Sequence, residues 1–195
     1  MIVSVSGLAC IRGGRRLYSG LSFALDAGES LRISGPNGVG KSSLLRQICG
    51  LIPCTAGTIL LDGAPGVTLA DERAALDTER SLHDALLFWA RLDGASSARL
   101  SQAIDRMALA PLAELPVRML STGQRKRAVL ARALASHARL WLLDEPGNGL
   151  DDASLAALGQ AMDAHLAGGG AIIAASHFAL THRFTRTLDL REDAA

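Results

Sequence analysis

The stretch from Gly35 to Ser42 sets the strongest limit on the possible folds of this chain. Its letters, GPNGVGKS, fit the phosphate-binding P-loop pattern G-x-x-x-x-G-K-[ST]. Glycines let the backbone wrap a polyphosphate with successive N–H groups pointing inward, and the following helix adds the positive end of its dipole. The residues predicted to bind nucleotide here are Gly35, Pro36, Asn37, Gly38, Val39, Gly40, Lys41, Ser42 and Ser43.

Two side chains of this loop carry specific chemistry. Lys41 is expected to reach the β- and γ-phosphates as a point charge, and the Ser42 hydroxyl is expected to ligate Mg²⁺. The flanking segments support this interpretation, because 30–34 has the pattern of a buried strand and 42–49 that of a helix. The alternative, a Gly-rich turn with an unrelated lysine, leaves that context unexplained.

Length and composition narrow the class of protein further. A chain of 195 residues has room for one well-buried core but not for two full domains. No apolar run approaches the ~20 residues of a membrane-spanning helix, and the N-terminus lacks the pattern of a secretory signal, so we expect a cytosolic location. The net charge of +1 disfavours nucleic acid as a partner, and three cysteines without C-x-x-C spacing suggest reduced thiols.

The first part of the chain predicts an antiparallel β region followed by a helical one. Strands are expected at 2–8, 21–25 and 30–34, with a turn at 12–16 and a further strand at 58–61. From about Val67 the composition changes to Ala, Leu, Arg, Asp and Glu, with helical spacing in 84–91 and 98–109. We therefore predict a mostly helical region there, with Phe88 and Trp89 assigned to its core and a partner-binding role as the alternative.

The second part predicts strands alternating with helices. A helix is expected from Ser121 to about 136, a buried strand over 139–143 and a helix over 153–166. A strand at 171–175, a short helix and a strand at 187–190 follow. Parallel strands bind ligands at their carboxyl ends, where the P-loop, Asp144–Glu145 and His177 all fall, so one site is expected to gather them.

At this point the chain resembles the nucleotide-binding subunits of ABC transporters over nearly its whole length. The segments GPNGVGKS, LSTGQ, LWLLDEP and NGLD and the residue His177 occur in that family's order. The resemblance implies an α/β fold, a P-loop NTPase of ABC type with a mixed sheet core and an N-terminal antiparallel β region. It also implies a single domain, 1–195, with a small helical subdomain at about 67–136.

The resemblance also implies roles within one nucleotide site. Asp144 would hold Mg²⁺, through water in the expected arrangement, and Glu145 would polarise the water that attacks the γ-phosphate. His177 resembles the family's switch histidine, which contacts the γ-phosphate, and a purely structural histidine is the alternative. Lys41, Glu145 and His177 are the predicted catalytic residues, with ATP and Mg²⁺ as the ligands.

The LSTGQ segment implies a second subunit. In the family, residues matching Ser121, Gly123 and Gln124 meet the nucleotide bound to another copy, so two ATP molecules lie in a head-to-tail dimer. Asp151 falls in the loop that couples the two sites. The alternative is that LSTGQ is only a helix cap.

Two positions depart from the family pattern. The adenine-stacking aromatic falls near Arg12, whose guanidinium plane can also stack on a base, although a solvated turn residue is nearly as good an interpretation. The glutamine that links Mg²⁺ to the membrane subunit falls near Glu72, which could ligate the metal directly or through water.

Within the family, the short length, the segment from Leu21 to Glu29 and the start at 10–14 look most like the ATP-binding subunits of bacterial cytochrome c maturation exporters. That implies a peripheral ATPase on the cytoplasmic face of the inner membrane, paired with integral membrane subunits and without direct cargo contact. It would use ATP to drive the haem-handling step of cytochrome c biogenesis, either haem pumping or the release of a haem-loaded chaperone. Haem ligation is not expected: there is no C-x-x-C-H, and the histidines outside the nucleotide site fit solvated or structural roles. These are His83, His137, His165 and His182.

Other interpretations remain open from the sequence. They are an ABC ATPase serving another substrate, a soluble ABC-type ATPase acting on DNA or ribosomes, and a P-loop kinase of small metabolites. The soluble class usually needs a coiled-coil insert or a second nucleotide domain, and a kinase would leave the LSTGQ segment unexplained.

Overall fold

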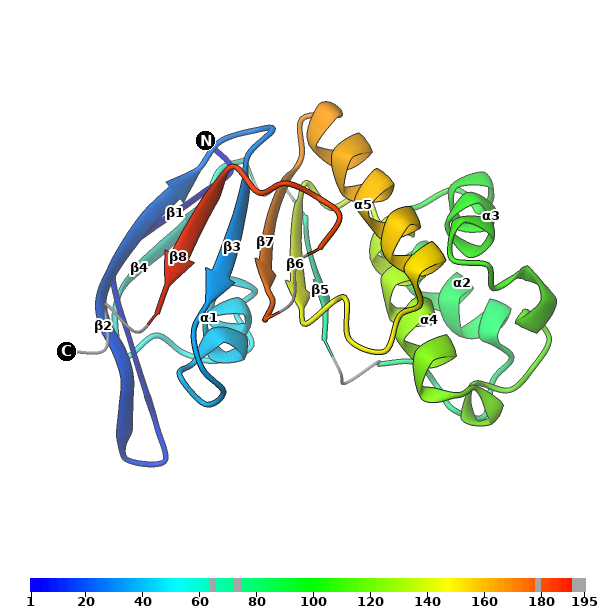
Figure 1. The fold of residues 1–195 in the computed structure, drawn as a ribbon, viewed down its shortest axis with the longest axis horizontal. Coiled ribbons are helices and arrows are strands. Elements are labelled where there is room, and N and C mark those ends of the chain that lie inside the picture. Colours follow the sequence, from blue (N-terminus) through cyan, green and yellow to red (C-terminus); the bar gives the residue numbers. More distant parts are fainter. Residues whose placement is uncertain (64–65, 72–74, 178–179, 191–195) are drawn as a thin grey trace.

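The N-terminal part of the computed structural model is a three-stranded antiparallel sheet (Figure 1). The structure describes residues 1–63, 66–71, 75–177 and 180–190. Strands β1 (Val3–Arg12), β2 (Arg15–Leu25) and β4 (Ala56–Leu61) lie in the order β2-β1-β4. The hairpin between β1 and β2 turns on Gly13 and Gly14, whose φ values of 55° and 76° favour glycine.

A five-stranded parallel sheet forms the centre of the molecule. Its order is β5-β6-β7-β3-β8, and every neighbouring pair is parallel. The strands are β3 (Ser30–Ser34), β5 (Val67–Ala70), β6 (Leu140–Asp144), β7 (Ala171–Ala175) and β8 (Arg186–Asp189). β6 and β7 are buried along their whole length, as expected for central strands covered on both faces.

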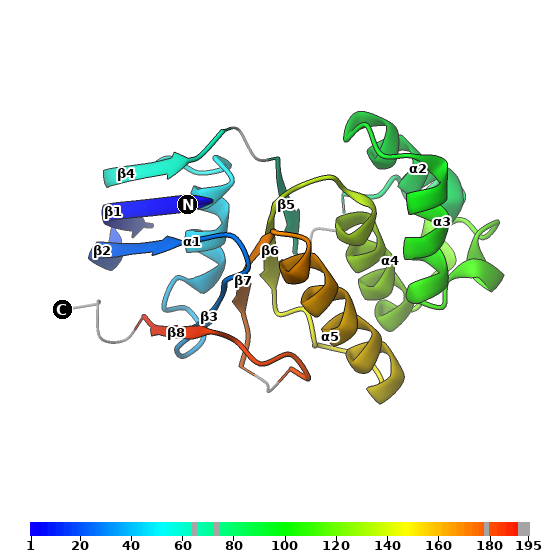
Figure 2. The same ribbon diagram turned by 90° about the horizontal axis from the view of Figure 1, so that it is seen from above.

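Helices cover this parallel sheet on both faces (Figure 2). Helix α1 (Lys41–Ile48) lies between the two sheets, and α4 (Thr122–Ala135) and α5 (Asp152–Ala167) lie on the opposite face. Beyond α4 lie α2 (Leu82–Leu92), α3 (Ser97–Arg106) and the short 3₁₀ turns η1 (Ala110–Leu112) and η2 (Val117–Met119). One apolar core surrounds α1, and a second joins the sheet to the other helices.

This architecture confirms the predicted α/β class with its mixed sheets and its helical region. Two local predictions are wrong. Residues 67–70 form β5 and pair with β6, so the helical region does not begin at Val67. The short helix expected before β8 is absent from 180–185, although 178–179 lie outside the described residues. None of the helices in the described ranges is long and apolar enough to span a membrane.

Candidate active site

The P-loop approaches the N-terminal sheet so closely that one of its glycines is sterically required. Gly40, the N-cap of α1, has a φ of 118°. A Cβ atom on Gly40 would lie 2.9 Å from Cε1 of Tyr18, which is fully buried. Tyr18 is fixed in turn, because its hydroxyl donates a 2.6 Å hydrogen bond to Gln47 of α1. The first residues of α1 are thereby locked onto β2.

Lys41, the first residue of α1, turns its ammonium group back into the loop. Nζ donates to the carbonyl oxygens of Gly35 at 2.9 Å and Pro36 at 3.3 Å, and it lies 3.9 Å from Oε1 of Glu145. Burial lowers the pKa of Lys41, and the nearby carboxylates of Glu145 and Asp144 oppose that shift. The result is a buried positive charge at the mouth of a loop built to receive phosphate.

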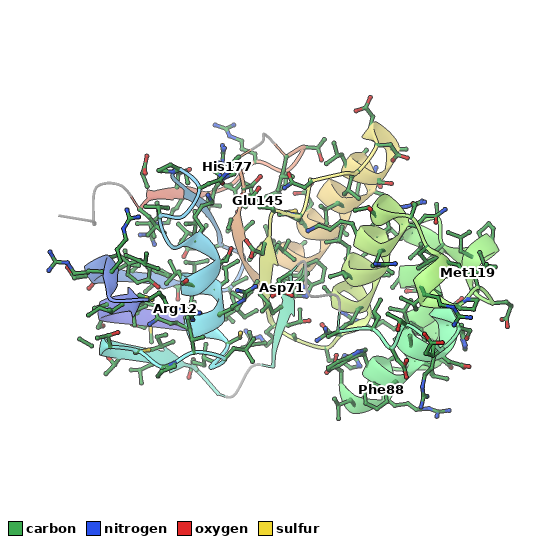
Figure 3. The ribbon with its side chains drawn as sticks, turned by 90° about the horizontal axis from the view of Figure 1, so that it is seen from below. Arg12, Asp71, Phe88, Met119, Glu145 and His177 are labelled. Carbon is green, nitrogen blue, oxygen red and sulfur yellow. The ribbon has the colours of Figure 1, made fainter. Side chains whose placement is uncertain are left out.

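His177 closes the site from the end of β7. Its Nε2 atom lies 2.6 Å from Lys41 Nζ, 2.7 Å from Asn37 Oδ1 and 3.2 Å from Glu145 Oε1. The backbone N–H of His177 donates to Glu145 Oε2 at 3.2 Å, and Figure 3 shows the two side chains as neighbours. Three segments far apart in sequence therefore meet here, as expected for carboxyl ends of parallel strands.

The Asp144–Glu145 pair ends β6 in an unusual backbone state. Asp144 is 6% exposed, and burial raises its pKa while a hydrogen bond from Ser42 lowers it. Its Oδ1 atom has no hydrogen-bond partner among the described residues. Glu145 has a φ of 46°, in the left-handed region where a side chain costs about 1 kcal/mol or more. An unpartnered carboxylate oxygen beside a serine hydroxyl suits a hard cation such as Mg²⁺.

These groups line a cavity of about 750 Å³, a volume typical of small-ligand sites. Nine predicted residues line it: Asn37, Gly38, Gly40, Lys41, Ser42, Ser43, Asp144, Glu145 and His177. Gly35, Pro36 and Val39 form the loop without lining the cavity. Sequence reasoning missed Leu17, Arg46 and Asn148, which complete the wall. Nothing in the motif pattern marks Leu17 or Arg46, whereas Asn148 belongs to the NGLD segment.

The two departures from the family pattern have different outcomes. Arg12 is exposed at the end of β1, paired with Arg15, and it does not line the cavity (Figure 3). Base stacking by Arg12 therefore stays a prediction. Glu72 lies outside the described residues. Its neighbour Asp71 accepts a 2.9 Å hydrogen bond from Arg46 of α1, so the chain entering that position is tied to the cavity wall.

The LSTGQ segment forms a second, separate recess. Ser121 caps α4 through a capping box: its side chain accepts from the Gln124 backbone N–H at 3.2 Å, and the Gln124 side chain accepts from the Ser121 N–H at 2.9 Å. A Cβ on Gly123 would lie 2.9 Å from the Gly149 carbonyl oxygen, so only glycine allows this contact.

This recess, of about 220 Å³, shares no lining residue with the P-loop cavity. It is lined by Ser121, Gly123, Gln124, Arg127, Gly149, Leu150, Asp151 and Ser154. Asp151 caps α5, accepting from the Ser154 N–H at 2.8 Å. Within one chain, therefore, the LSTGQ residues do not complete the site around Lys41.

One contact nevertheless joins α4 to the active site. Lys126 Nζ donates to the backbone carbonyl of Asp144 at 3.0 Å, and its charge favours ionised Asp144. Sequence reasoning did not single out Lys126, because a basic residue on a helix is ordinarily assigned to a solvated face.

Comparison with known proteins gives a consistent result. The ABC transporter family model matches residues 18–148. The chain is 50% identical over 180 residues to the cytochrome c biogenesis ATP-binding export protein CcmA of Sphingopyxis alaskensis, covering 92% of both chains. It is also 50% identical to the CcmA of Zymomonas mobilis, covering 96% of this chain and 84% of the relative.

A solved structure has the same fold. An ABC transporter ATP-binding protein from Pyrococcus furiosus superimposes with a TM-score of 0.86, at 21% identity and full coverage of both chains. The P-loop cavity, the Asp144–Glu145 pair and the separate LSTGQ recess are thus found in a chain whose sequence and fold both match one family. This chain belongs to the ABC transporter family, as one of its ATP-binding, ATP-hydrolysing subunits.

Proposed function

We propose that this chain powers an exporter that acts in cytochrome c maturation, as the peripheral ATPase on the cytoplasmic face of the bacterial inner membrane. Relatives named cytochrome c biogenesis ATP-binding export protein match most of this chain at up to 50% identity. ATP binding and hydrolysis would drive the haem-handling step through separate integral membrane subunits, without direct cargo contact by this chain.

The single observation that carries the proposed mechanism is the separation of the two phosphate-facing sites. Lys41, Glu145 and His177 gather in one cavity, whereas Ser121 and Gly123 line another. The N-terminal turn of α4 suits a phosphate because its N–H groups and dipole favour anions. A head-to-tail dimer would place this turn against the γ-phosphate held by the partner's P-loop, giving two sites per dimer.

Each active-site residue then has a defined task. Lys41 and the loop N–H groups bind and neutralise the phosphates. Glu145 accepts a hydrogen bond from the attacking water and takes its proton as the new oxygen–phosphorus bond forms, while the bond from the γ-phosphorus to the β–γ bridging oxygen breaks and ADP leaves. His177 holds the γ-phosphate oxygens at the position set by Asn37 and Glu145. Ser42 and Asp144 would hold Mg²⁺, which supplies charge neutralisation to the β- and γ-oxygens.

A mixing experiment tests the shared site. Lys41→Ala removes the P-loop ammonium but leaves the LSTGQ segment intact, whereas Gly123→Ala does the reverse. In a mixed head-to-tail dimer, one of the two sites is intact. It combines the unchanged P-loop of the Gly123→Ala chain with the unchanged LSTGQ segment of the Lys41→Ala chain. We expect the ATPase rate of the mixture to exceed the sum of the rates of the two variants measured alone. No recovery over a wide range of protein concentration would exclude the shared site.

Exposed apolar side chains support our proposal that the helical end of the molecule contacts the membrane subunits. Phe88, Leu92 and Met119 are 54%, 67% and 66% exposed. Figure 3 places Phe88 and Met119 there, away from Glu145 and His177. The sequence assignment of Phe88 to the core is therefore wrong, while Trp89 is half-buried and donates from Nε1 to the Ala75 carbonyl.

Affinity capture from detergent-solubilised membranes tests the cargo assignment. Co-purification of multi-span subunits encoded with cytochrome c maturation factors supports it. Subunits of an unrelated transporter would favour another substrate, and ribosomes or DNA would contradict a transport function.

A further inference from the structure

The segment that follows His177 is attached to the rest of the fold by a series of hydrogen bonds. We call residues 180–185 the return segment, because it leads from the end of β7 back to the start of β8 (Figure 1). Thr181 donates its hydroxyl to the Leu155 carbonyl of α5 at 2.9 Å. Leu180 packs where a side chain on Gly147 would lie, 3.0 Å from its Cδ2. The segment thus touches the loop just after Glu145.

His182 makes the central contact of the return segment. Its Nδ1 lies 2.6 Å from Asp163 Oδ1 on α5, and its Nε2 lies 3.0 Å from Ser30 Oγ at the start of β3. The His182 side chain is 4% exposed, and its ring packs edge-on against Phe184 at 4.9 Å between centroids. One imidazole therefore bridges α5 and β3 in the interior.

One arrangement of hydrogens, with a neutral imidazole, satisfies every group of this bridge. Ser30 Oγ accepts from the Thr185 N–H at 3.1 Å, so its own hydrogen is available for His182 Nε2. Nδ1 then carries the ring hydrogen and donates to Asp163. Thr185 Oγ1 accepts from the Ser30 N–H and donates to the Ser30 carbonyl, at 2.9 and 2.7 Å. Each donor in the bridge has an acceptor.

The order Ser30, His182, Asp163 is also that of a hydrolase triad, but the structure excludes that role. A nucleophilic serine must be reachable by a substrate carbonyl. Ser30 is 0% exposed, and its oxygen is already occupied by the Thr185 N–H. The three side chains therefore hold parts of the fold in place and do not carry out nucleophilic attack.

We propose that His182 is a positioning residue for His177, acting through the return segment; this rests on the proposed role of His177 at the γ-phosphate. His177 follows β7 after one intervening residue, Ser176. Beyond His177, the return segment is the next part of the chain for which the structure describes hydrogen bonds to other elements. The Ser30–His182–Asp163 bridge fixes that attachment on two elements, and so limits where His177 can lie beside Lys41 and Glu145.

Two variants break the bridge at different places. His182→Phe keeps a ring against Phe184 but removes both hydrogen bonds, whereas Asp163→Ala removes only the acceptor on α5. Asp163 is 67% exposed, so its truncation leaves the core intact. Asp163→Asn retains an acceptor oxygen and is the conservative variant. Asp105→Asn, an exposed aspartate on α3, is the matched control.

Steady-state ATPase kinetics with a double-mutant cycle test the proposal. Misplacement of His177 should lower kcat roughly five- to twentyfold in His182→Phe and less in Asp163→Ala, with the KM for ATP changed by less than about twofold. Asp163→Asn and Asp105→Asn should stay near the wild-type rate. In a His177→Ala background, breaking the bridge should cause no further loss of kcat, because the positioned group is gone.

Several results would overturn it. An equal fall in kcat in the His177→Ala background would make the bridge a general support of the fold. An unchanged kcat in both bridge variants, or a loss confined to KM, would also refute it. Thermal melts of every variant identify losses caused by unfolding. A wild-type ATPase rate that is lost in Glu145→Gln supports the proposed nucleotide site independently of the bridge. A wild-type chain without ATPase activity would contradict both the proposed site and the positioning role of His182.

Discussion

The P-loop cavity and the LSTGQ recess each lie at the N-terminus of a helix, yet they differ in how many of the proposed catalytic side chains they contain. The cavity gathers side chains from the P-loop, β6 and β7, with Lys41, Glu145 and His177 within 4 Å of one another. The recess is formed by the N-terminal ends of α4 and α5 and by the loop at 149–151 that precedes α5. This difference supports the proposed shared site, in which one chain holds the catalytic side chains and a neighbouring chain completes the site.

The largest expected effect is on the cavity side. Glu145→Gln keeps the size of the side chain but removes the base, so kcat should fall by roughly 10²–10⁴-fold, the usual contribution of general base catalysis. ATP affinity, measured with a labelled nucleotide, should stay within a fewfold of wild type. A variant that retains full turnover would contradict the assignment of Glu145.

The corresponding change on the recess side should act only in the dimer. Gly123→Ala places a Cβ against the Gly149 carbonyl and shifts the loop from α4. We expect a roughly tenfold lower ATPase rate, equivalent to about 1.4 kcal/mol in the barrier. Nucleotide affinity of dilute monomer should not change. Weakened binding by the monomer would mean that the two regions are not separate.

A smaller effect is expected on the free energy of unfolding when the helix cap in the LSTGQ recess is removed. Ser121→Ala removes the capping hydrogen bond to the Gln124 N–H, which should lower the free energy of unfolding by about 1 kcal/mol in urea denaturation. Ser101→Ala, at an exposed position within α3, should change it by less than about 0.5 kcal/mol. Equal effects would show that the capping box contributes nothing special.

The smallest expected effect is a gain in stability, and it concerns Asp144 in the P-loop cavity. Because burial raises the pKa of Asp144, the unfolded chain loses this proton at a lower pH than the folded chain does. Ionisation therefore costs the folded state stability as the pH rises above the ordinary aspartate value of about 3.9. Asp144→Asn should raise the melting temperature at pH 7, and the gain should disappear towards pH 4. If the gain in melting temperature persisted at low pH, the ionisation of Asp144 would not be its cause.

The sequence predicted best those features that depend on local patterns. The P-loop follows from glycine spacing, the cap at Ser121 from its place before an apolar helix, and the buried strand β6 from a continuous apolar run. The meeting of Lys41, Asp144, Glu145 and His177 followed from the rule that ligands bind at the carboxyl ends of parallel strands. These four side chains are indeed brought together.

What could not be predicted depends on tertiary partners. The four-residue strand β5 is too short to show a period, and only pairing with β6 makes it a strand. Leu17 lines the cavity because the hairpin of β1 and β2 reaches the P-loop, and Lys126 reaches Asp144 because α4 packs beside β6. The bridge at His182 joins residues 152 positions apart, beyond any local pattern.

The left-handed backbone of Glu145 has a practical consequence for protein engineering. At a φ of 46°, glycine would be tolerated better than any side chain, and a library screened for heat resistance would favour it. Such a selection would enrich thermally robust proteins that no longer turn over ATP. Stabilisation campaigns on this scaffold should therefore keep position 145 fixed and seek their improvements elsewhere.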